Sequence, residues 1–249
     1  MSDNTLGRID VHSHLLPGID DGCPTLAESL ECARRLVQAG YSHSFCTPHI
    51  WPNLPDNTIE GIARQVVALQ RALDQAQIPL RLIPGGELNL RPDITETPAD
   101  QVPTYGMAHR YCLFDIWVDR IPAFFWEAVD WLQSMDLKVV LAHPERMRAV
   151  QNDPDIADEF ADRGLLLQGN LQCLGDPPHA DTRQVAERYL IEKRYFMLGS
   201  DLHNLAGLPI RMNGLARAIE LVGETEVWKL TRDNPSQLVP GKILLIDEC

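Results

Sequence analysis

The 249-residue sequence is 45% hydrophobic and 23% charged, which is typical of a globular chain that forms one domain, here residues 1–249. Its formal net charge of −13 argues against nucleic acid as a general partner, because phosphate backbones require a basic surface. The chain has neither the roughly 18-residue apolar run of a membrane span nor an N-terminal signal peptide, so we expect a cytoplasmic protein without membrane insertion.

Short apolar runs alternate with amphipathic helical patterns along the whole chain. The apolar runs predict strands at residues 8–15, 42–49, 80–88, 111–117, 138–144, 165–171 and 195–201. The helical patterns cover residues 25–40, 57–77, 122–135, 155–164, 181–193 and 211–231. This alternation predicts an α/β fold with parallel strands, and the chain length favours a closed barrel. An open doubly wound sheet is the alternative, but no G-x-G-x-x-G turn is present.

Six cysteines are scattered along the sequence, and no two of them form a C-x-x-C pair. Their spacing does not indicate a disulfide framework, so we expect mostly buried thiols that act as small apolar groups. None of them begins a C-x5-R sequence. The phosphate-binding loop of cysteine-dependent phosphatases is therefore absent.

Residue types that bind metals recur at the C-terminal ends of six of the seven predicted strands. They are His12, His14, His49, Glu87, Asp115, His143, Asp201 and His203. Active sites of α/β barrels lie at this end of the strands, and residues two apart on a strand share a face. All of these side chains offer nitrogen or oxygen, which suits zinc, manganese or iron.

The carboxylates in this set, together with Asp21, would repel one another in a small cavity unless cations neutralised them. A single pair of histidines in a strand is more often structural than functional, so the metal hypothesis depends on the whole constellation. We expect Asp10 to accept structural hydrogen bonds. We treat His43, His109 and His179 as ordinary histidines.

Five motifs occur in a fixed order: IDVHSHLLPGIDDG, TPH, GGE, AHPER and GSDLHN. In this order they resemble the PHP (polymerase and histidinol phosphatase) superfamily, and more closely its CpsB/CapC group of bacterial protein-tyrosine phosphatases. The resemblance extends over nearly the whole chain, through NPSQLVPG. It implies a distorted seven-stranded (β/α) barrel, the PHP fold, that binds three divalent metal ions, typically manganese.

The resemblance also implies a role for each motif residue. The first metal would be held by His12, His14, Glu87 and Asp201. Glu87 would bridge to a second metal, shared with Asp115 and His143, and the third would be held by Asp21, His49 and His203. Arg146 matches a family arginine that grips the phosphate, whereas we expect Asp20 only to shape its loop.

Two positions depart from the family pattern. Asp115 stands where the family usually has glutamate, and the shorter side chain is expected to weaken the second metal site. Leu208 stands where the family tends to have an arginine, and Arg211 is the nearest arginine that could replace it.

The leading hypothesis is metal-dependent hydrolysis of a phosphomonoester, in which divalent metals activate water and Arg146 binds phosphate. The resemblance implies phosphotyrosine on an autophosphorylating bacterial tyrosine kinase that controls capsule or exopolysaccharide synthesis. One alternative is a small-molecule phosphatase with a substrate like histidinol phosphate, and another is a non-catalytic metal-binding regulatory protein. Homo-oligomerisation is compatible with the sequence.

Overall fold

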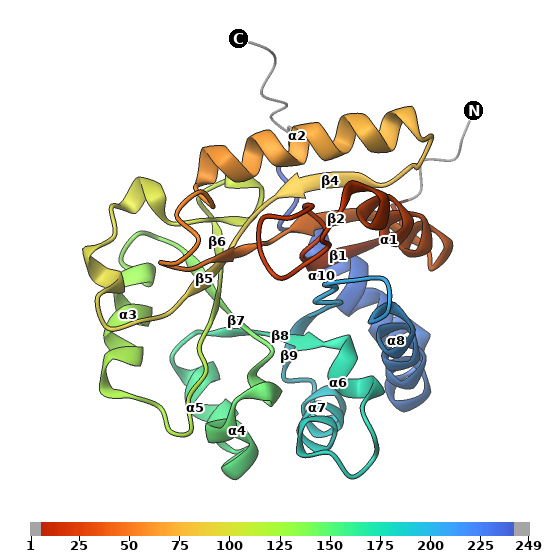
Figure 1. The fold of residues 1–249 in the computed structure, drawn as a ribbon. Helices are drawn as coiled ribbons and strands as arrows, with labels where there is room; N and C mark the ends of the chain where they lie inside the picture. Colours follow the sequence, from red (N-terminus) through yellow and green to blue (C-terminus); the bar gives the residue numbers. More distant parts are fainter. Residues whose placement is uncertain (1–5, 242–249) are drawn as a thin grey trace.

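Parallel strands and helices alternate along the chain in a computed structural model that describes residues 6–241 (Figure 1). The strands are β1 (Arg8–Ser13), β2 (Tyr41–Cys46), β3 (His49–Ile50), β4 (Arg81–Pro84), β5 (Glu87–Asn89), β6 (Tyr111–Asp115), β7 (Lys138–Ala142), β8 (Leu166–Asn170) and β9 (Tyr195–Gly199). The α-helices are α1 (Leu26–Gln38), α2 (Ile59–Gln75), α3 (Ala123–Gln133), α4 (Arg148–Asn152), α5 (Ile156–Asp162), α6 (Leu171–Gly175), α7 (Asp181–Ile191), α8 (Leu208–Val222), α9 (Glu224–Trp228) and α10 (Asn234–Ser236).

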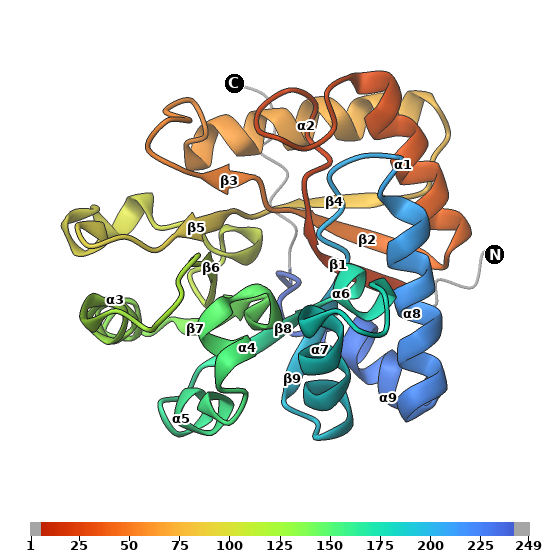
Figure 2. The same cartoon turned by 60° about the horizontal axis from the view of Figure 1, so that its bottom comes forward.

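The strands form two parallel sheets, in the orders β1-β2-β4 and β3-β5-β6-β7-β8-β9. Sheet order follows chain order, as in a (β/α) barrel, and does not reverse as in a doubly wound sheet. Figures 1 and 2 show the helices around the outside of the strands. Between β1 and the end of β9, the described residues form one isolated bridge, Ser13 with Leu202, and no continuous ladder. The predicted α/β class with parallel strands is confirmed.

Two of the seven predicted strands are each divided into two pieces. The second is interrupted at residues 47–48, where Pro48 has no N–H to donate to a ladder. The third predicted strand, residues 80–88, is interrupted at Gly85 and Gly86, between β4 and β5. The chain packs closely at this break, because a Cβ on Gly86 would lie 2.7 Å from the Ile50 side chain. The outer pieces β3 and β5 pair with each other, and this moves His49 and Glu87 to the start of short strands.

The stretch predicted as helical, residues 211–231, begins earlier in the structure and is interrupted at Gly223. Helix α8 begins at Leu208, because Pro209 lies in the first turn, where its missing N–H costs no helical hydrogen bond. It ends before Gly223, whose φ of +81° is incompatible with a continuing helix. The shorter α9 and a π-helical turn, Lys229–Asp233, follow. Within residues 6–241, no helix is long and apolar enough to cross a lipid bilayer.

Apolar side chains from six strands meet in one buried cluster in the middle of the fold. Its members from the strands are Ile9, Val11, Phe45, Ile83, Tyr111, Leu113, Val140, Ala142 and Met197. A larger buried cluster joins the strands to the helices around them. Close packing on both sides fixes the strand ends rigidly, which is what a site built from several strands requires. The single-domain organisation of residues 1–249 stays a prediction.

Candidate metal centre

Two imidazoles at the end of β1 are each oriented by a hydrogen bond on the far side of the ring. Nδ1–H of His12 donates to Oε1 of Gln168 at 2.8 Å, and Nδ1–H of His14 donates to Oδ2 of Asp20 at 2.7 Å. The two Nε2 atoms face the same space, 3.2 Å apart, which confirms that both side chains lie on one face of the strand. Metal-binding histidines commonly have this arrangement, because the second group fixes the tautomer.

Glu87 lies at the centre of the cluster, directly opposite His49 in the pairing of β3 with β5. Its Oε2 lies 2.8 Å from Nδ1 of His49, 3.4 Å from Nε2 of His12 and 3.7 Å from Nε2 of His14. Its Oε1 lies 3.0 Å from Nε2 of His143, which follows β7 with a left-handed φ of 32°. One carboxylate therefore contacts histidines from three different strand ends.

Asp201, just after β9, links the histidines of β1 to Arg146. Its Oδ1 lies 3.4 Å from Nε2 of both His12 and His14. Its Oδ2 accepts hydrogen bonds from Nη1 of Arg146 and Nδ2 of Asn170, each at 2.8 Å. Asp201 has a φ of 51°, in the left-handed region that costs energy for a residue other than glycine but that aspartate adopts more readily than most.

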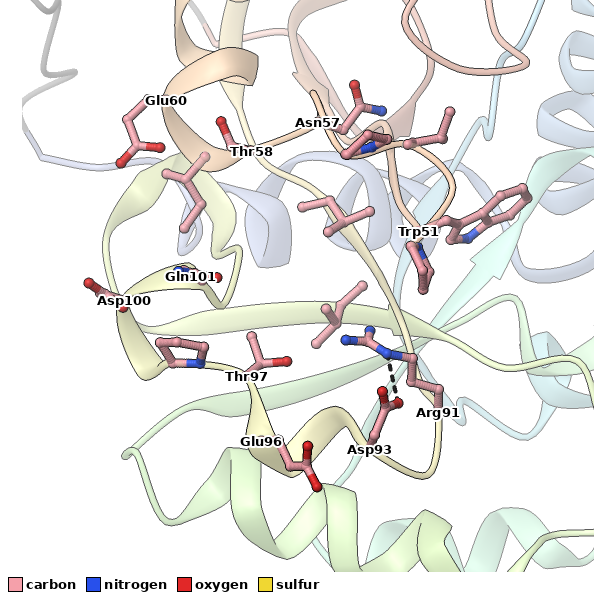
Figure 3. Close-up of a pocket in the computed structure, with 17 residues that line it drawn as sticks. Trp51, Asn57, Thr58, Glu60, Arg91, Asp93, Glu96, Thr97, Asp100 and Gln101 are labelled. Atoms are coloured by element: carbon pink, nitrogen blue, oxygen red, sulfur yellow. Dashed lines mark ion pairs between the residues drawn. The ribbon is translucent and has the colours of Figure 1, made fainter.

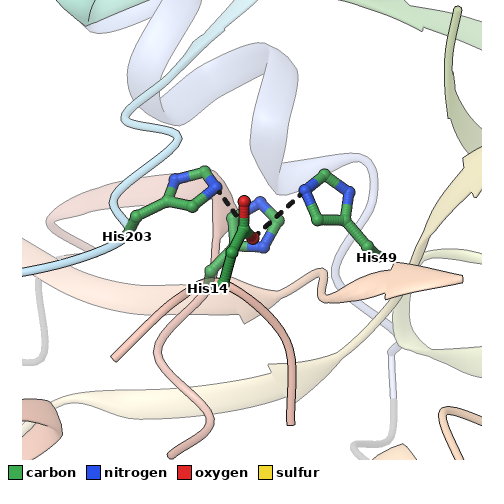
Figure 4. Close-up of side chains that lie close together, drawn as sticks. His14, His49 and His203 are labelled. Atoms are coloured by element: carbon green, nitrogen blue, oxygen red, sulfur yellow. Dashed lines mark ion pairs between the residues drawn. The ribbon is translucent and has the colours of Figure 1, made fainter. Parts of the chain in front are cut away.

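Asp21 contacts His49 and His203 on the open side of the cluster, and Figure 4 shows the rings of these two histidines together with His14. Its Oδ1 is 3.3 Å from Nε2 of His49 and 3.4 Å from Nε2 of His203, and its side chain is 58% exposed. The ring of His203 stacks on that of His14, with centroids 3.9 Å apart. Gly22 lets the loop approach this closely, because a Cβ there would lie 2.2 Å from the carbonyl oxygen of His14.

Asp115 ends β6 on the other side of Glu87. Its Oδ2 accepts a hydrogen bond from Nε1 of Trp117 at 2.9 Å, and its Oδ1 accepts a longer one from Nδ2 of Asn89 at 3.4 Å. Asp115, Glu87 and His49 offer ligand atoms that lie within 4.8 Å of one another. The shorter aspartate side chain therefore still reaches the cluster.

All nine candidate ligands fall into overlapping groups whose ligand atoms lie within 4.8 Å of one another. The groups are His12, His14 and Glu87; His12, His143 and Asp201; His49, Glu87 and Asp115; and His14, Asp21, His49 and His203. They overlap with the three sets that the resemblance implies without matching them residue for residue. The assignment of each residue to a particular ion stays a prediction.

Two buried atoms of the cluster that could bind a metal lack a hydrogen-bond partner within the described residues. Oε2 of Glu87 and Nδ1 of His49 are close, but neither forms a hydrogen bond of acceptable geometry. Because both rings donate through Nδ1, neutral His12 and His14 present two unprotonated Nε2 atoms 3.2 Å apart, which repel each other unless a proton or a cation lies between them. An unsatisfied buried polar group costs about 1–3 kcal/mol. Divalent cations would satisfy these atoms, and the set of nitrogen and oxygen donors fits zinc, manganese or iron.

The histidines and carboxylates of the cluster shift one another's pKa values. Burial opposes the charged form of His14, but its hydrogen bond to Asp20 helps to raise its pKa well above the ordinary value. Burial likewise opposes ionisation of Glu87, but the charge of His12 helps to hold its pKa well below the ordinary value. Burial, and then the charge of Glu87, raises the pKa of Asp115 to about 7. Bound cations would replace these protons.

Neither Leu208, at the second position that departs from the family pattern, nor the nearby Arg211 is placed to bind phosphate. Leu208 is buried in the first turn of α8 and lines an apolar groove. The guanidinium of Arg211 is buried and donates to the backbone carbonyls of Ser200, Asp201 and Gly207. Arg211 therefore braces the loop that carries Asp201 and does not replace the family arginine as a phosphate clamp.

The remaining candidates have structural surroundings. Asp10 accepts hydrogen bonds from the backbone N–H and the hydroxyl of Ser200, at 2.8 Å and 2.5 Å, which confirms its expected role. His43 is partly buried on β2 and hydrogen-bonds the neighbouring Ser42 hydroxyl at 2.8 Å. None of His43, His109 and His179 joins a potential metal-binding group within residues 6–241.

Sequence reasoning missed the residues that orient the ligands. Asp20 does more than shape its loop, because its carboxylate orients His14 while also accepting the backbone N–H of Gly22 at 2.9 Å. Gln168 and Asn170 lie on β8, the one predicted strand without a candidate ligand, and bind His12 and Asp201. The available signal was a pair of polar residues two apart at the end of the apolar run LLLQGN.

A cavity of about 600 Å³ adjoins the cluster but contains none of the nine candidate ligands (Figure 3). Its walls include Trp51 and Leu88, which follow His49 and Glu87 in the chain, and Arg91, whose Nε pairs with Asp93 at 2.8 Å. The Trp51 ring stacks on His49 with centroids 4.0 Å apart. Trp51 therefore contacts both this cavity and the cluster of candidate ligands.

Comparisons with known proteins agree with this geometry. A family model described as "Capsular polysaccharide synthesis, CpsB/CapC" matches residues 8–240. The chain is 28% identical over 201 residues to the tyrosine-protein phosphatase YwqE of Bacillus subtilis, covering 79% of this chain and 78% of that protein. It is 22% identical over 240 residues to the putative tyrosine-protein phosphatase CapC of Staphylococcus aureus, covering 96% and 92%.

Solved structures show the same fold. One chain from crystal structures of YwqE from Bacillus subtilis and CpsB from Streptococcus pneumoniae, described as metal-dependent tyrosine phosphatases, matches with a TM-score of 0.83. The match covers 92% of this chain and 94% of that chain at 24% identity. The phosphotriesterase homology protein of Escherichia coli, solved with phosphate in its active site, matches with a TM-score of 0.58 at 12% identity, covering 94% and 99%.

Proposed function

This chain belongs to the CpsB/CapC family of capsular polysaccharide synthesis proteins, as its motifs predicted, and we propose that it is a metal-dependent phosphatase that hydrolyses phosphotyrosine in proteins. The observation that carries the proposal is the convergence of nine candidate ligands with nitrogen and oxygen donors, Glu87 among them, beside Arg146 at an open rim. Relatives named tyrosine-protein phosphatases in Bacillus subtilis and Streptococcus agalactiae support it.

The proposal includes three divalent metal ions, most simply manganese, with iron and zinc as the alternatives. Their ligands are His12, His14, Asp21, His49, Glu87, Asp115, His143, Asp201 and His203. Bound cations would supply Lewis acidity and lower the pKa of a nearby water molecule, so that a nucleophile is available at neutral pH. Asp20 and Gln168 hold the Nδ1 protons of the two β1 histidines, so that each Nε2 faces the cluster where the ions would bind.

Arg146 is the residue that we assign to phosphate binding. Its side chain is 30% exposed, and Nη1 donates to Asp201, a member of the cluster. The other guanidinium N–H groups can donate to phosphate oxygens, whose geometry matches the planar fork of arginine. The ion pair with Asp201 holds Arg146 beside the ligands, so a phosphate that contacts the cluster also meets the guanidinium.

The chain's own thiols do not supply a nucleophile in this mechanism. The five cysteines within the described residues are all buried, and none belongs to a potential metal-binding group. Burial raises the pKa of Cys46 and of Cys112, which lie on β2 and β6, well above that of a free thiol. A buried neutral thiol is a poor nucleophile. The hydrogen bond with Cys32 lowers the pKa of Cys23, but Cys23 is fully buried and its thiol is not accessible, so hydrolysis depends on water.

We further propose that the substrate is an autophosphorylating bacterial tyrosine kinase involved in capsule or exopolysaccharide synthesis. The family description, capsular polysaccharide synthesis, supports that setting. A phenolate is a good leaving group, so phosphotyrosine needs little acid catalysis from the protein. A cytoplasmic location and homo-oligomerisation stay predictions.

One assay separates this function from its alternatives. The metal-depleted protein is reconstituted with Mn²⁺, its metal content is measured, and kcat/KM is compared for a phosphotyrosine peptide and histidinol phosphate. We expect hydrolysis that requires metal and favours the peptide. A preference for histidinol phosphate would instead identify a small-molecule phosphatase. Bound metal without hydrolysis of either ester would identify a non-catalytic metal-binding protein.

A further inference from the structure

Trp117 is a large aromatic side chain exposed at the rim of the metal cluster. It follows β6, two residues after Asp115, and is 54% exposed. Within residues 6–241 the other exposed large hydrophobic side chains are Leu6, Leu26 and Ile191, none of them aromatic. Single exposed apolar residues are common, so the exposure becomes informative only through what holds this ring in place.

Three residues of the site hold the indole. Its Nε1–H donates to Oδ2 of Asp115 at 2.9 Å. The guanidinium carbon of Arg146 lies 4.5 Å from the ring centroid, a cation–π distance, and the His143 ring lies 6.0 Å away, centroid to centroid. The ring is therefore fixed between candidate metal ligands and the phosphate-binding arginine, while more than half of the side chain stays accessible.

We propose that the exposed part of Trp117 binds the aromatic ring of the substrate's leaving group and so favours aryl over alkyl phosphates. The phenyl ring of phosphotyrosine is joined to its phosphate by a single oxygen, so a phosphate on Arg146 brings the ring to the indole packed against that arginine. This inference rests on the proposed phosphatase function and adds a residue that selects the class of ester.

Trp51 does not take this role. Its ring lies 4.0 Å from that of His49 and stacks on it, and it forms a wall of the neighbouring cavity (Figure 3). Trp51 is partly buried, whereas Trp117 is exposed and contacts Arg146. Replacement by leucine should therefore remove the preference for aryl ligands at Trp117 but not at Trp51. Trp51→Leu serves as a comparison at the same rim.

The test uses ligands that cannot be hydrolysed. Kd is measured by calorimetry for phenylphosphonate and methylphosphonate, with the Mn²⁺-loaded wild type, Trp117→Leu, Trp117→Phe and Trp51→Leu. A stacked aromatic pair contributes enough for about a three- to tenfold preference. We expect the wild type to prefer phenylphosphonate by that factor. Trp117→Phe should keep most of the preference, and Trp117→Leu should lose it. The metal content should be unchanged in both variants.

Trp131→Phe is the matched control, because Trp131 lies in the last turn of α3, at the end of the helix away from the rim. An unchanged preference in Trp117→Leu overturns the proposal, as does loss of the preference in Trp51→Leu alone. If Trp117→Leu bound both phosphonates more weakly by the same factor and also lost metal, the proposal would be overturned, because Trp117 would then act only through Asp115. The binding ratio does not depend on turnover, so a wild type that prefers phenylphosphonate but hydrolyses no ester would retain this site and refute the phosphatase function.

Discussion

Replacing Asp20 by asparagine should weaken metal binding although Asp20 is not one of the nine candidate ligands. Its Oδ2 accepts Nδ1–H of His14 at 2.7 Å and the backbone N–H of His49 at 3.1 Å, and its Oδ1 accepts the backbone N–H of Gly22 at 2.9 Å. Asparagine has one acceptor oxygen in place of two. If that oxygen stays with His14, the amide NH₂ faces the N–H of Gly22, and one hydrogen bond is lost.

The magnitude follows from these contacts. Losing the carboxylate charge that supports a metal-binding histidine lowers metal affinity by about 10- to 100-fold, or about 1.4–2.7 kcal/mol. The lost backbone hydrogen bond should lower the free energy of unfolding of the metal-free protein by about 1 kcal/mol. Calorimetric titration of the metal-depleted Asp20→Asn protein with Mn²⁺ measures the first quantity, and urea unfolding measures the second.

The exposed Asp162, the last residue of α5, provides the control, because Asp162→Asn makes the same chemical change at a residue that belongs to none of the potential metal-binding groups. It should leave the Mn²⁺ affinity within about twofold of wild type, a difference that corresponds to about 0.4 kcal/mol. A wild-type affinity in Asp20→Asn would refute the reasoning, since it would mean that the orientation of His14 does not matter for metal binding.

Three further outcomes follow from the same contacts. The Mn²⁺ affinity should fall as pH falls below about 7, because protons compete for His14, whose pKa is raised, and for Asp115, whose pKa is about 7; titrations at several pH values measure this. Burial lowers the pKa of His43, so the unfolded chain binds more protons and stability falls as pH falls through 6.5; His43→Gln should reduce this dependence of Tm without changing metal content. Leu208→Arg should lower the free energy of unfolding by about 2 kcal/mol or more, because it buries a charge. Increased phosphatase activity in that variant would contradict the placement of Leu208 in an apolar groove that contains none of the candidate ligands.

The arrangement of the fold followed from the sequence because each strand is an apolar run bounded by clear turn residues. Thr25 begins the first helix as expected, and its hydroxyl accepts the backbone N–H of Glu28 at 3.3 Å. The interruptions at Pro48 and at Gly85 were not predicted, because a proline or two glycines at a strand end also fit an ordinary turn. Pairing of the outer pieces β3 and β5 depends on tertiary contacts that local patterns do not encode.

Eight of the nine candidate ligands could be identified because histidine and carboxylate residues are uncommon at the ends of apolar runs, whereas Asp21 lies in the loop after the first run and took its proposed role from the family resemblance. Asp20, Gln168 and Trp117 could not be, because their roles depend on which atom of a neighbouring side chain they contact. The hypothesis that Arg211 replaces a family arginine depended on sequence distance alone. The helical path of α8 directs that side chain to the carbonyls behind Asp201.

The central claim is that the cluster around Glu87 holds the divalent metals that hydrolysis requires. The most direct measurement is phosphate release from a phosphotyrosine peptide by metal-depleted protein during titration with Mn²⁺, for wild type and Glu87→Gln. The account predicts no release without metal, recovery in the wild type as Mn²⁺ is added, and no recovery in Glu87→Gln at the same concentrations. Full activity of the wild type after exhaustive metal removal, or wild-type recovery in Glu87→Gln, would contradict it.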